Sequence, residues 1–346
     1  MLKSKLRIFI LGLAVPSLIV YGLYVAGLAY ENQKLFARNG MAFNYSRAFR
    51  DGRIDKDHPP LSVVVLGDST GNASVAPLFF KKKYMVNLAL PLGTAITSYI
   101  AMENVLAQGP APKCFLMIHQ YNWEHGYGHF FDSTVFFRGL NFKELTDVWD
   151  IGSANDLWPA NSFNRFSFFF QAARARLRID KLRLDSLREA LISPSFNLGG
   201  EQHDVQQRMY EGRGYLLFFK TILPEDRFFI DDIYKFYLGD FSANKTEDFY
   251  LHKMSRLAKA HGSKFFFGII PAAESDFVDK TAKFRADRDA HIQELFRDDP
   301  DVTLLDWPKT LPRDLYFNFT HLNVRGAIYF KTHMADKIYK LCGKQI

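Results

Sequence analysis

Two short polar segments, far apart in the chain, hold residue types that could carry out acyl transfer. The first, Gly67-Asp68-Ser69, follows the apolar run 61–66, which the sequence pattern predicts to be a buried strand with a sharp turn after it. Ser69 would then lie at the start of the next helix, beside backbone N–H groups that favour negative charge. His321 lies about 250 residues later, just before a predicted C-terminal helix. A serine needs a neighbouring base to become a nucleophile at neutral pH, so the two segments together predict serine-dependent acyl transfer.

Two further residues follow predicted strands in the same way. Gly93 comes after the second short strand and Asn122 after the third. In chain order, the serine, glycine, asparagine and histidine segments resemble the four blocks of the SGNH (GDSL-type) hydrolase superfamily. The resemblance covers roughly residues 60–125 and 245–335.

The resemblance implies a role for each of these residues. Ser69 would be the nucleophile and His321 the general base. The oxyanion hole would consist of the Ser69 backbone N–H, the Gly93 backbone N–H and the Asn122 side chain. Asp68 would order the turn rather than react.

The third catalytic position departs from the family pattern. Three residues before His321, where the family carries aspartate, this chain has Asn318. An asparagine can hydrogen-bond the imidazole, but it does not stabilise the imidazolium as a carboxylate does. Three interpretations follow: a dyad of Ser69 and His321, another acid such as Asp314 or Asp306 in the third role, or a weakly active or non-catalytic relative.

The predicted elements alternate between strand and helix and place these residues at strand ends. Apolar runs predict strands at 61–66, 84–88, 113–119, 264–270 and 302–305, and helical spacing predicts helices at 95–107, 246–261 and 279–297. This alternation is typical of an α/β fold with a parallel sheet covered on both faces. With the resemblance, it predicts a flavodoxin-like SGNH three-layer fold over residues 61–340.

A long segment interrupts this alternation. Residues 124–245, approximately, are too many for a loop in a compact domain, and we expect a mostly helical insertion. Within it, the phenylalanine-rich run 163–170 precedes the basic run 171–183. The two runs could lie at a lipid interface, form a core with a solvated helix face, or dock against a membrane partner.

The N-terminus carries the features of a membrane anchor. Residues 8–30 are uncharged and mostly apolar, long enough to cross a bilayer, and follow three basic residues, Lys3, Lys5 and Arg7. We therefore expect residues 1–30 to form a cytoplasmic tip and transmembrane anchor, 31–60 to be a tether or packed linker, and the remainder to lie outside the cytoplasm. The alternative is a cleaved signal peptide with a small-residue site at 27–29.

The composition of the chain limits the partners and cofactors that we expect. The net charge is +7 and the pI is about 9.1, which suits an anionic surface or polymer, and no nucleic-acid-binding motif accompanies the charge. His119, His125 and His129 have no acidic or thiol partner at a zinc-binding spacing, so neither a metal nor a cofactor is expected. For Cys114 and Cys342, a disulfide is possible, but the pattern favours a buried thiol and a separate thiol in the polar tail.

Within the superfamily, the anchor and the two catalytic segments are similar to the bacterial branch that modifies cell-surface polymers. That branch includes the D-alanyl transfer protein of teichoic acid and the accessory acetyltransferases of exopolysaccharides. The resemblance implies an O-acyltransferase that works beside a multi-spanning membrane-bound O-acyltransferase and transfers acetyl or D-alanyl groups to a polysaccharide or teichoic-acid-like polymer. The alternatives are an extracytoplasmic esterase or deacetylase using the same site, and a non-catalytic scaffold.

Overall fold

A five-stranded parallel sheet forms the centre of the molecule. The computed structural model describes residues 41–52, 61–77, 85–120, 130–135, 139–158, 164–177, 240–274, 281–317 and 321–342. The sheet strands are β1 (Val63–Gly67), β2 (Met85–Asn87), β3 (Cys114–Ile118), β4 (Lys264–Gly268) and β6 (Val302–Leu304). Their spatial order is β2-β1-β3-β4-β6, and every neighbouring pair is parallel. This is the flavodoxin-like strand order, so the predicted α/β class with a parallel sheet is confirmed.

Both faces of the sheet are buried, which explains why the strands read as unbroken apolar runs. In β1, Val64 and Leu66 belong to one hydrophobic core, and Val63 and Val65 belong to the core on the other face. The register pairs the last residues of β1, β3 and β4, so these strands end at the same level. The loops that leave these ends therefore share one edge of the sheet.

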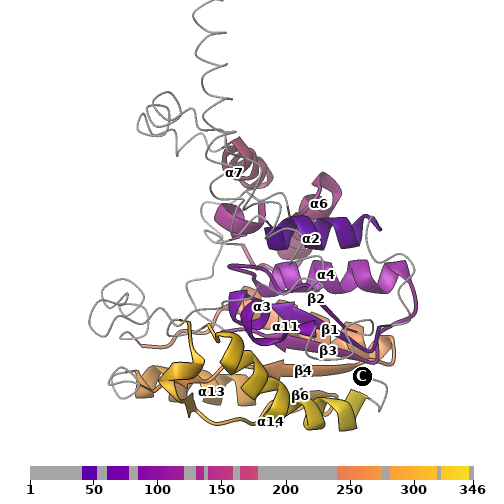
Figure 1. Cartoon of the computed structure of the whole chain (residues 1–346). Coiled ribbons are helices and arrows are strands. Elements are labelled where there is room, and N and C mark those ends of the chain that lie inside the picture. The colour runs from indigo at the N-terminus through magenta and orange to yellow at the C-terminus, as the bar shows by residue number, and fades with distance from the viewer. Residues whose placement is uncertain are drawn as a thin grey trace, which may run out of the picture.

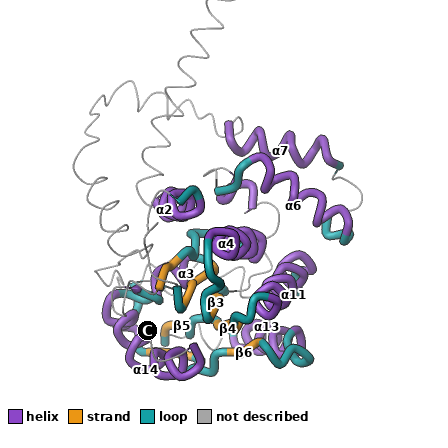
Figure 2. Tube along the Cα trace, turned by 90° about the vertical axis from the view of Figure 1, so that its right-hand side faces the viewer, coloured by secondary structure: helices purple, strands orange, loops and turns teal. Residues whose placement is uncertain are grey.

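Helices cover the two faces unequally. The first core is covered by α2 (Met41–Arg50), α4 (Ala95–Gln108), α11 (Lys245–Ala260) and α13 (Ala282–Leu295). The second core is covered by α14 (Val324–Cys342). Figures 1 and 2 show α4 and α14 on opposite sides of the strands, which makes the domain three-layered. The three helices predicted between strands are confirmed, and α4 begins at a capping box formed by Thr94 and Thr97.

The N-terminal part of the chain is described only in part. Helix α2 lies inside the predicted 31–60 linker, and Tyr45 and Phe49 are buried there, so this part of the linker is packed rather than a free tether. None of the helices in the described ranges is both long and apolar enough to cross a membrane. The predicted anchor at 8–30 lies outside those ranges.

The described parts of the insertion include three helical segments. They comprise a π-helix (Phe130–Val135), α6 (Phe142–Ala154) and α7 (Arg165–Leu177). The ring of Phe168 is fully buried and contacts four other buried rings, those of Phe130, Phe131, Trp149 and Trp158. Phe166 and Phe170 point the other way and are exposed. Phe168 therefore packs in the core, whereas Phe166 and Phe170 do not.

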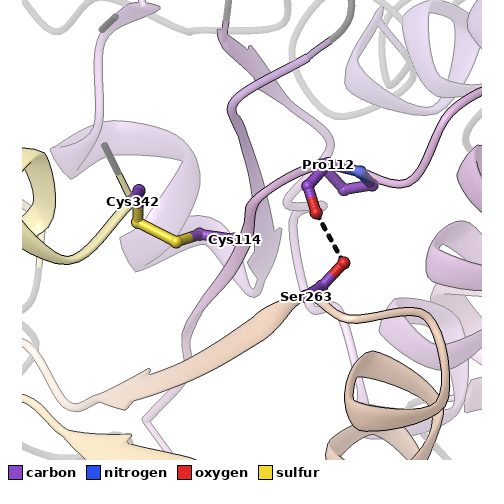
Figure 3. The surroundings of a disulfide bond; sticks show 4 residues. All are labelled: Pro112, Cys114, Ser263 and Cys342. Carbon is purple, nitrogen blue, oxygen red and sulfur yellow. Dashed lines mark hydrogen bonds between the residues drawn. A yellow bond between two sulfur atoms is a disulfide. The ribbon is translucent and has the colours of Figure 1, made fainter. Parts of the chain in front are cut away.

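The expectation of two separate thiols is wrong. Cys114 and Cys342 form a disulfide with their Cα atoms 5.7 Å apart (Figure 3). Cys342 is not in a polar tail, because α14 continues to this residue and buries it beside the first residue of β3. Near the same end of β3, the Ser263 hydroxyl donates to the Pro112 carbonyl and joins the segments that lead into β3 and β4.

The pattern also missed a small second sheet. Strand β5 (Ala272–Ala273) pairs in parallel with β7 (Thr310–Leu311), just beyond the ends of β4 and β6. A single 3-10 turn (Arg313–Leu315) follows and leads into the histidine segment. Strands of two residues are too short to show a period in the sequence.

Candidate active site

The structure brings Ser69 and His321 into direct contact. The imidazole Nε2 of His321 lies 2.7 Å from the Oγ of Ser69. Ser69 is the first residue of the short helix α3 (Ser69–Ser74), and His321 lies just before α14. Both residues are half-buried. With the proton of the neutral ring on Nδ1, Nε2 accepts the hydrogen bond of the serine hydroxyl, which is the arrangement a general base requires.

The turn after β1 explains the position of Ser69. Gly67 has a φ of +123°, and a Cβ there would lie 1.8 Å from the Ile118 carbonyl oxygen, so only glycine fits. Asp68 is the N-cap of α3: its Oδ1 accepts from the backbone N–H of Thr70 at 2.8 Å and from the Thr70 hydroxyl at 2.6 Å. Its Oδ2 accepts from the Gln120 N–H at 2.8 Å. Asp68 therefore orders the turn and ties the ends of β1 and β3 together.

The Gly93 segment packs directly against this turn. The Leu90 N–H donates to the Gly67 carbonyl at 3.0 Å, and a Cβ on Gly93 would lie 2.3 Å from the same oxygen. The Gly93 N–H donates to the Leu90 carbonyl at 2.8 Å, so its expected oxyanion role requires it to share or release that bond. The Ser69 N–H, in contrast, is at the first position of its helix and has no acceptor within it.

A buried polar pair beneath the Gly93 segment was not predicted. The Nε2 of His119 lies 3.0 Å from the Gly93 carbonyl oxygen and must carry a proton to donate to it. Glu247 accepts from the Ala95 N–H at 3.0 Å, and the same carboxylate oxygen lies 3.8 Å from His119 Nε2. Both side chains are buried. Burial raises the pKa of Glu247, and the nearby His119 and the Ala95 N–H oppose that rise.

The histidine segment is held by its own asparagine. The Asn323 side chain accepts from the Gly326 N–H at 3.0 Å and so caps α14. Its amide donates to the carbonyls of Asp314 and Tyr316 at 2.8 and 3.1 Å. Burial lowers the pKa of His321, and the Asp68 carboxylate acts in the opposite direction. A pKa below the ordinary histidine value favours the neutral ring, which can accept a proton, at neutral pH.

The third position of the triad is only partly described. Asn318 and Asn122 both lie outside the described residues. The Asp314 carboxylate lies 2.9 Å from a guanidinium nitrogen of Arg325 on the exposed surface, so its partner is an arginine. Asp306 lines a separate cavity beyond the ends of β4 and β6. Within the described part of the chain, the carboxylate that acts on the pKa of His321 is Asp68.

Comparison with known proteins adds no assignment. No protein-family model, curated protein or solved structure matches the chain. Among the described residues, no cluster of three or more His, Cys, Asp or Glu side chains could hold a metal ion. The chemistry of the site therefore has to be inferred from its own geometry.

Proposed function

We propose that this protein is an SGNH-like serine acyltransferase that forms an acyl-serine at Ser69. The observation that carries the proposal is the 2.7 Å contact between His321 Nε2 and Ser69 Oγ, at the carboxyl edge of a parallel sheet. That edge is where open α/β sheets place their ligands. The fixed turn around Asp68 and the lowered pKa of His321 both suit a neutral base waiting beside a serine hydroxyl.

The reaction would proceed in two halves. In the first, His321 takes the Ser69 proton while Oγ attacks the carbonyl carbon of an ester or thioester. The Ser69 N–H donates to the resulting oxyanion, and the imidazolium returns the proton to the leaving group as the acyl-serine forms. In the second half, an acceptor hydroxyl loses its proton to His321 and attacks the acyl carbon. The imidazolium then returns that proton to Ser69 Oγ as the bond between Oγ and the acyl carbon breaks.

We further propose that the enzyme acts outside the cytoplasm and acylates a polymer. An anchor at 8–30 would hold the domain outside the cytoplasm, and the chain's net charge of +7 suits an anionic polymer there. The Cys114–Cys342 disulfide is of the kind found in oxidising compartments. The transferred group would be acetyl or D-alanyl, the acceptor a polysaccharide or teichoic-acid-like polymer, and the partner a multi-spanning membrane O-acyltransferase. The serine–histidine contact supports an enzyme over a scaffold.

An acyl-enzyme experiment tests this proposal. The purified protein is mixed with p-nitrophenyl acetate, quenched in acid and digested, and the peptide that contains Ser69 is examined by mass spectrometry. We expect one acetyl group on Ser69 in the wild type and none in Ser69→Ala. Adding a polysaccharide should direct acetyl to its hydroxyls, whereas free acetate as the sole product would identify an esterase. Equal hydrolysis by wild type and Ser69→Ala would contradict both enzymes.

A further inference from the structure

A cavity of about 250 Å³ lies beyond the ends of β4 and β6, next to α13. Its apolar lining includes Ile269, Ile270, Pro271, Leu305, Trp307 and Pro308. The polar groups gather mainly on α13 and on the segment that leads into β7. A small concave site with an apolar wall and a few converging polar groups is the usual form of a ligand site, and this volume is below the range for drug-sized molecules.

The polar side of the cavity is basic. Arg285, Arg288 and Ile292 recur at helical spacing on the face of α13 that lines the cavity, and Lys309 joins them from the loop before β7. Among the described residues of the wall, the acidic side chains are Asp289 and Asp306. The three basic side chains outnumber these two, so the described part of the wall favours an anionic ligand.

One of these charges is built rigidly into the wall. The side chain of Arg288 is only 6% exposed, and its Nε and Nη2 donate to Asp289 at 3.1 and 2.9 Å. Its Nη1 lies 3.5 Å from the Gln120 carbonyl oxygen. A buried guanidinium needs such partners to be tolerated. The other basic side chains that line the cavity, among the described residues, are those of Arg285 and Lys309.

Two residues that line the cavity are hydrogen-bonded to the segments that carry Ser69 and His321. Gln120 lines the cavity, and its N–H bonds to Asp68, the residue before Ser69. Pro271 also lines it, and its carbonyl accepts from the hydroxyl of Tyr316, which precedes His321 in the same segment, at 2.6 Å. A chain-like ligand that placed one unit in the cavity could therefore extend along the sheet edge to Ser69.

We propose that this cavity binds an acidic sugar unit, with its carboxylate facing Arg285 and Lys309 and its apolar face against Trp307. Guanidinium groups bind carboxylates with paired hydrogen bonds, and the aromatic wall suits the C–H face of a sugar ring rather than a bare phosphate. The inference rests on the proposed function only in treating this unit as part of the acceptor polymer. Binding itself needs no turnover.

Binding is therefore measured with the Ser69→Ala protein, in which the cavity residues are unchanged. Isothermal titration calorimetry compares an oligomer of glucuronic acid, a neutral glucose oligomer of the same length, and inorganic phosphate. We expect the acidic oligomer to bind at least about tenfold more tightly than either of the others, the scale of one charged hydrogen bond. Added salt should weaken that binding.

Variants locate the binding site. Adding Arg285→Ala or the exposed Lys309→Ala to this protein should weaken binding of the acidic oligomer about tenfold. The matched control is Arg297→Ala, because Arg297 lies just after the same helix, is exposed, and pairs with Glu294 away from the cavity. That variant should bind as the parent does. Thermal unfolding of each variant checks that the fold is kept.

Three results would overturn the proposal. The first is equal affinity for the neutral and acidic oligomers. The second is an affinity for phosphate as high as that for the acidic oligomer. The third is an unchanged affinity for the acidic oligomer in both the Arg285→Ala and the Lys309→Ala variants, each shown to be folded. Because none of these measurements uses the reaction, failure of acyl transfer at Ser69 would leave them unaffected. If the acidic oligomer does not bind, the proposed acyl transfer at Ser69 is unaffected.

Discussion

The imidazole of His119 donates to the carbonyl of Gly93 across 3.0 Å and thereby supports the loop beside Ser69 from inside the protein. Glu247 accepts from the Ala95 N–H at the start of α4, where this loop ends, although Glu247 lies 152 positions further along the chain. The loop thus has a buried polar support that reaches it from β3 and α11. In the proposed reaction, His119 and Glu247 would be positioning residues, since they contact the backbone at Gly93 and Ala95.

The Glu247 support can be tested by substitution. Glu247→Ala should leave the Ala95 N–H without its acceptor, which costs about 1–3 kcal/mol in unfolding free energy, and should lower kcat more than it changes KM. Glu247→Gln keeps an acceptor oxygen and should restore most of the activity. The exposed Glu294→Ala is the control. If Glu247→Gln and Glu247→Ala lower kcat equally, Glu247 does not act by accepting the hydrogen bond of the Ala95 N–H.

The pH dependence of kcat/KM reports the state of His321. Because burial lowers the pKa of this ring, the acid limb should fall below the ordinary histidine value of about 6.5, and activity should persist into mildly acidic solution. Asn318→Asp would introduce a carboxylate three residues before the ring. A carboxylate favours the imidazolium, so the pKa should rise and the limb should move to higher pH.

Asp314→Ala provides the matched control for this profile. Asp314 pairs with Arg325 on the surface, so its removal should leave the acid limb in place and the rate within about twofold, as expected of exposed ion pairs. A limb that moved with Asp314→Ala and not with Asn318→Asp would make Asp314 the third member of the site.

The disulfide should contribute to stability by closing a long loop. Cys114 and Cys342 are 228 positions apart, and the bond fastens the end of α14 to the start of β3. Cys342→Ser should lower the unfolding free energy by about 2–5 kcal/mol in urea denaturation. Reductant should destabilise the wild type to a similar degree and leave the variant unchanged. Two titratable thiols in the unreduced, denatured wild type would show that the bond is absent.

The two faces of α7 should respond differently to truncation. Phe168 is 0% exposed among its aromatic neighbours, so Phe168→Ala should cost about 3–5 kcal/mol. Phe166, two positions earlier, is 79% exposed, and Phe166→Ala should change the unfolding free energy by less than about 0.5 kcal/mol. Similar shifts in melting temperature for the two variants would contradict the described packing of α7.

The sheet and its helices could be predicted because their signals are local. The five apolar runs correspond to β1, β2, β3, β4 and β6, and the helical spacings correspond to α4, α11 and α13. The meeting of Ser69 with His321 could also be anticipated, because segments that follow parallel strands share one edge of the sheet. The resemblance to a family with four ordered segments predicts which serine and which histidine meet, Ser69 and His321.

What the sequence could not show depends on contacts between distant segments. Nothing near Glu247 distinguishes it from other acidic residues in the first turn of a helix, and its contact with the Ala95 N–H exists only once α11 packs on α4. The same holds for Cys342, whose distance from Cys114 depends on the full length of α14. The basic face of α13 was also hidden, because its arginines alternate with acidic residues along the chain.

Labelling with a fluorophosphonate probe tests the central claim most directly, because the probe reacts with a serine that a neighbouring base has activated. Wild-type protein, Ser69→Ala and His321→Ala are incubated with the probe at neutral pH, and the modified peptide is mapped by mass spectrometry. The 2.7 Å contact predicts labelling of the wild type at Ser69, none in Ser69→Ala, and strongly reduced labelling in His321→Ala. Equal labelling of wild type and Ser69→Ala would contradict the account, as would a wild type that stays unlabelled.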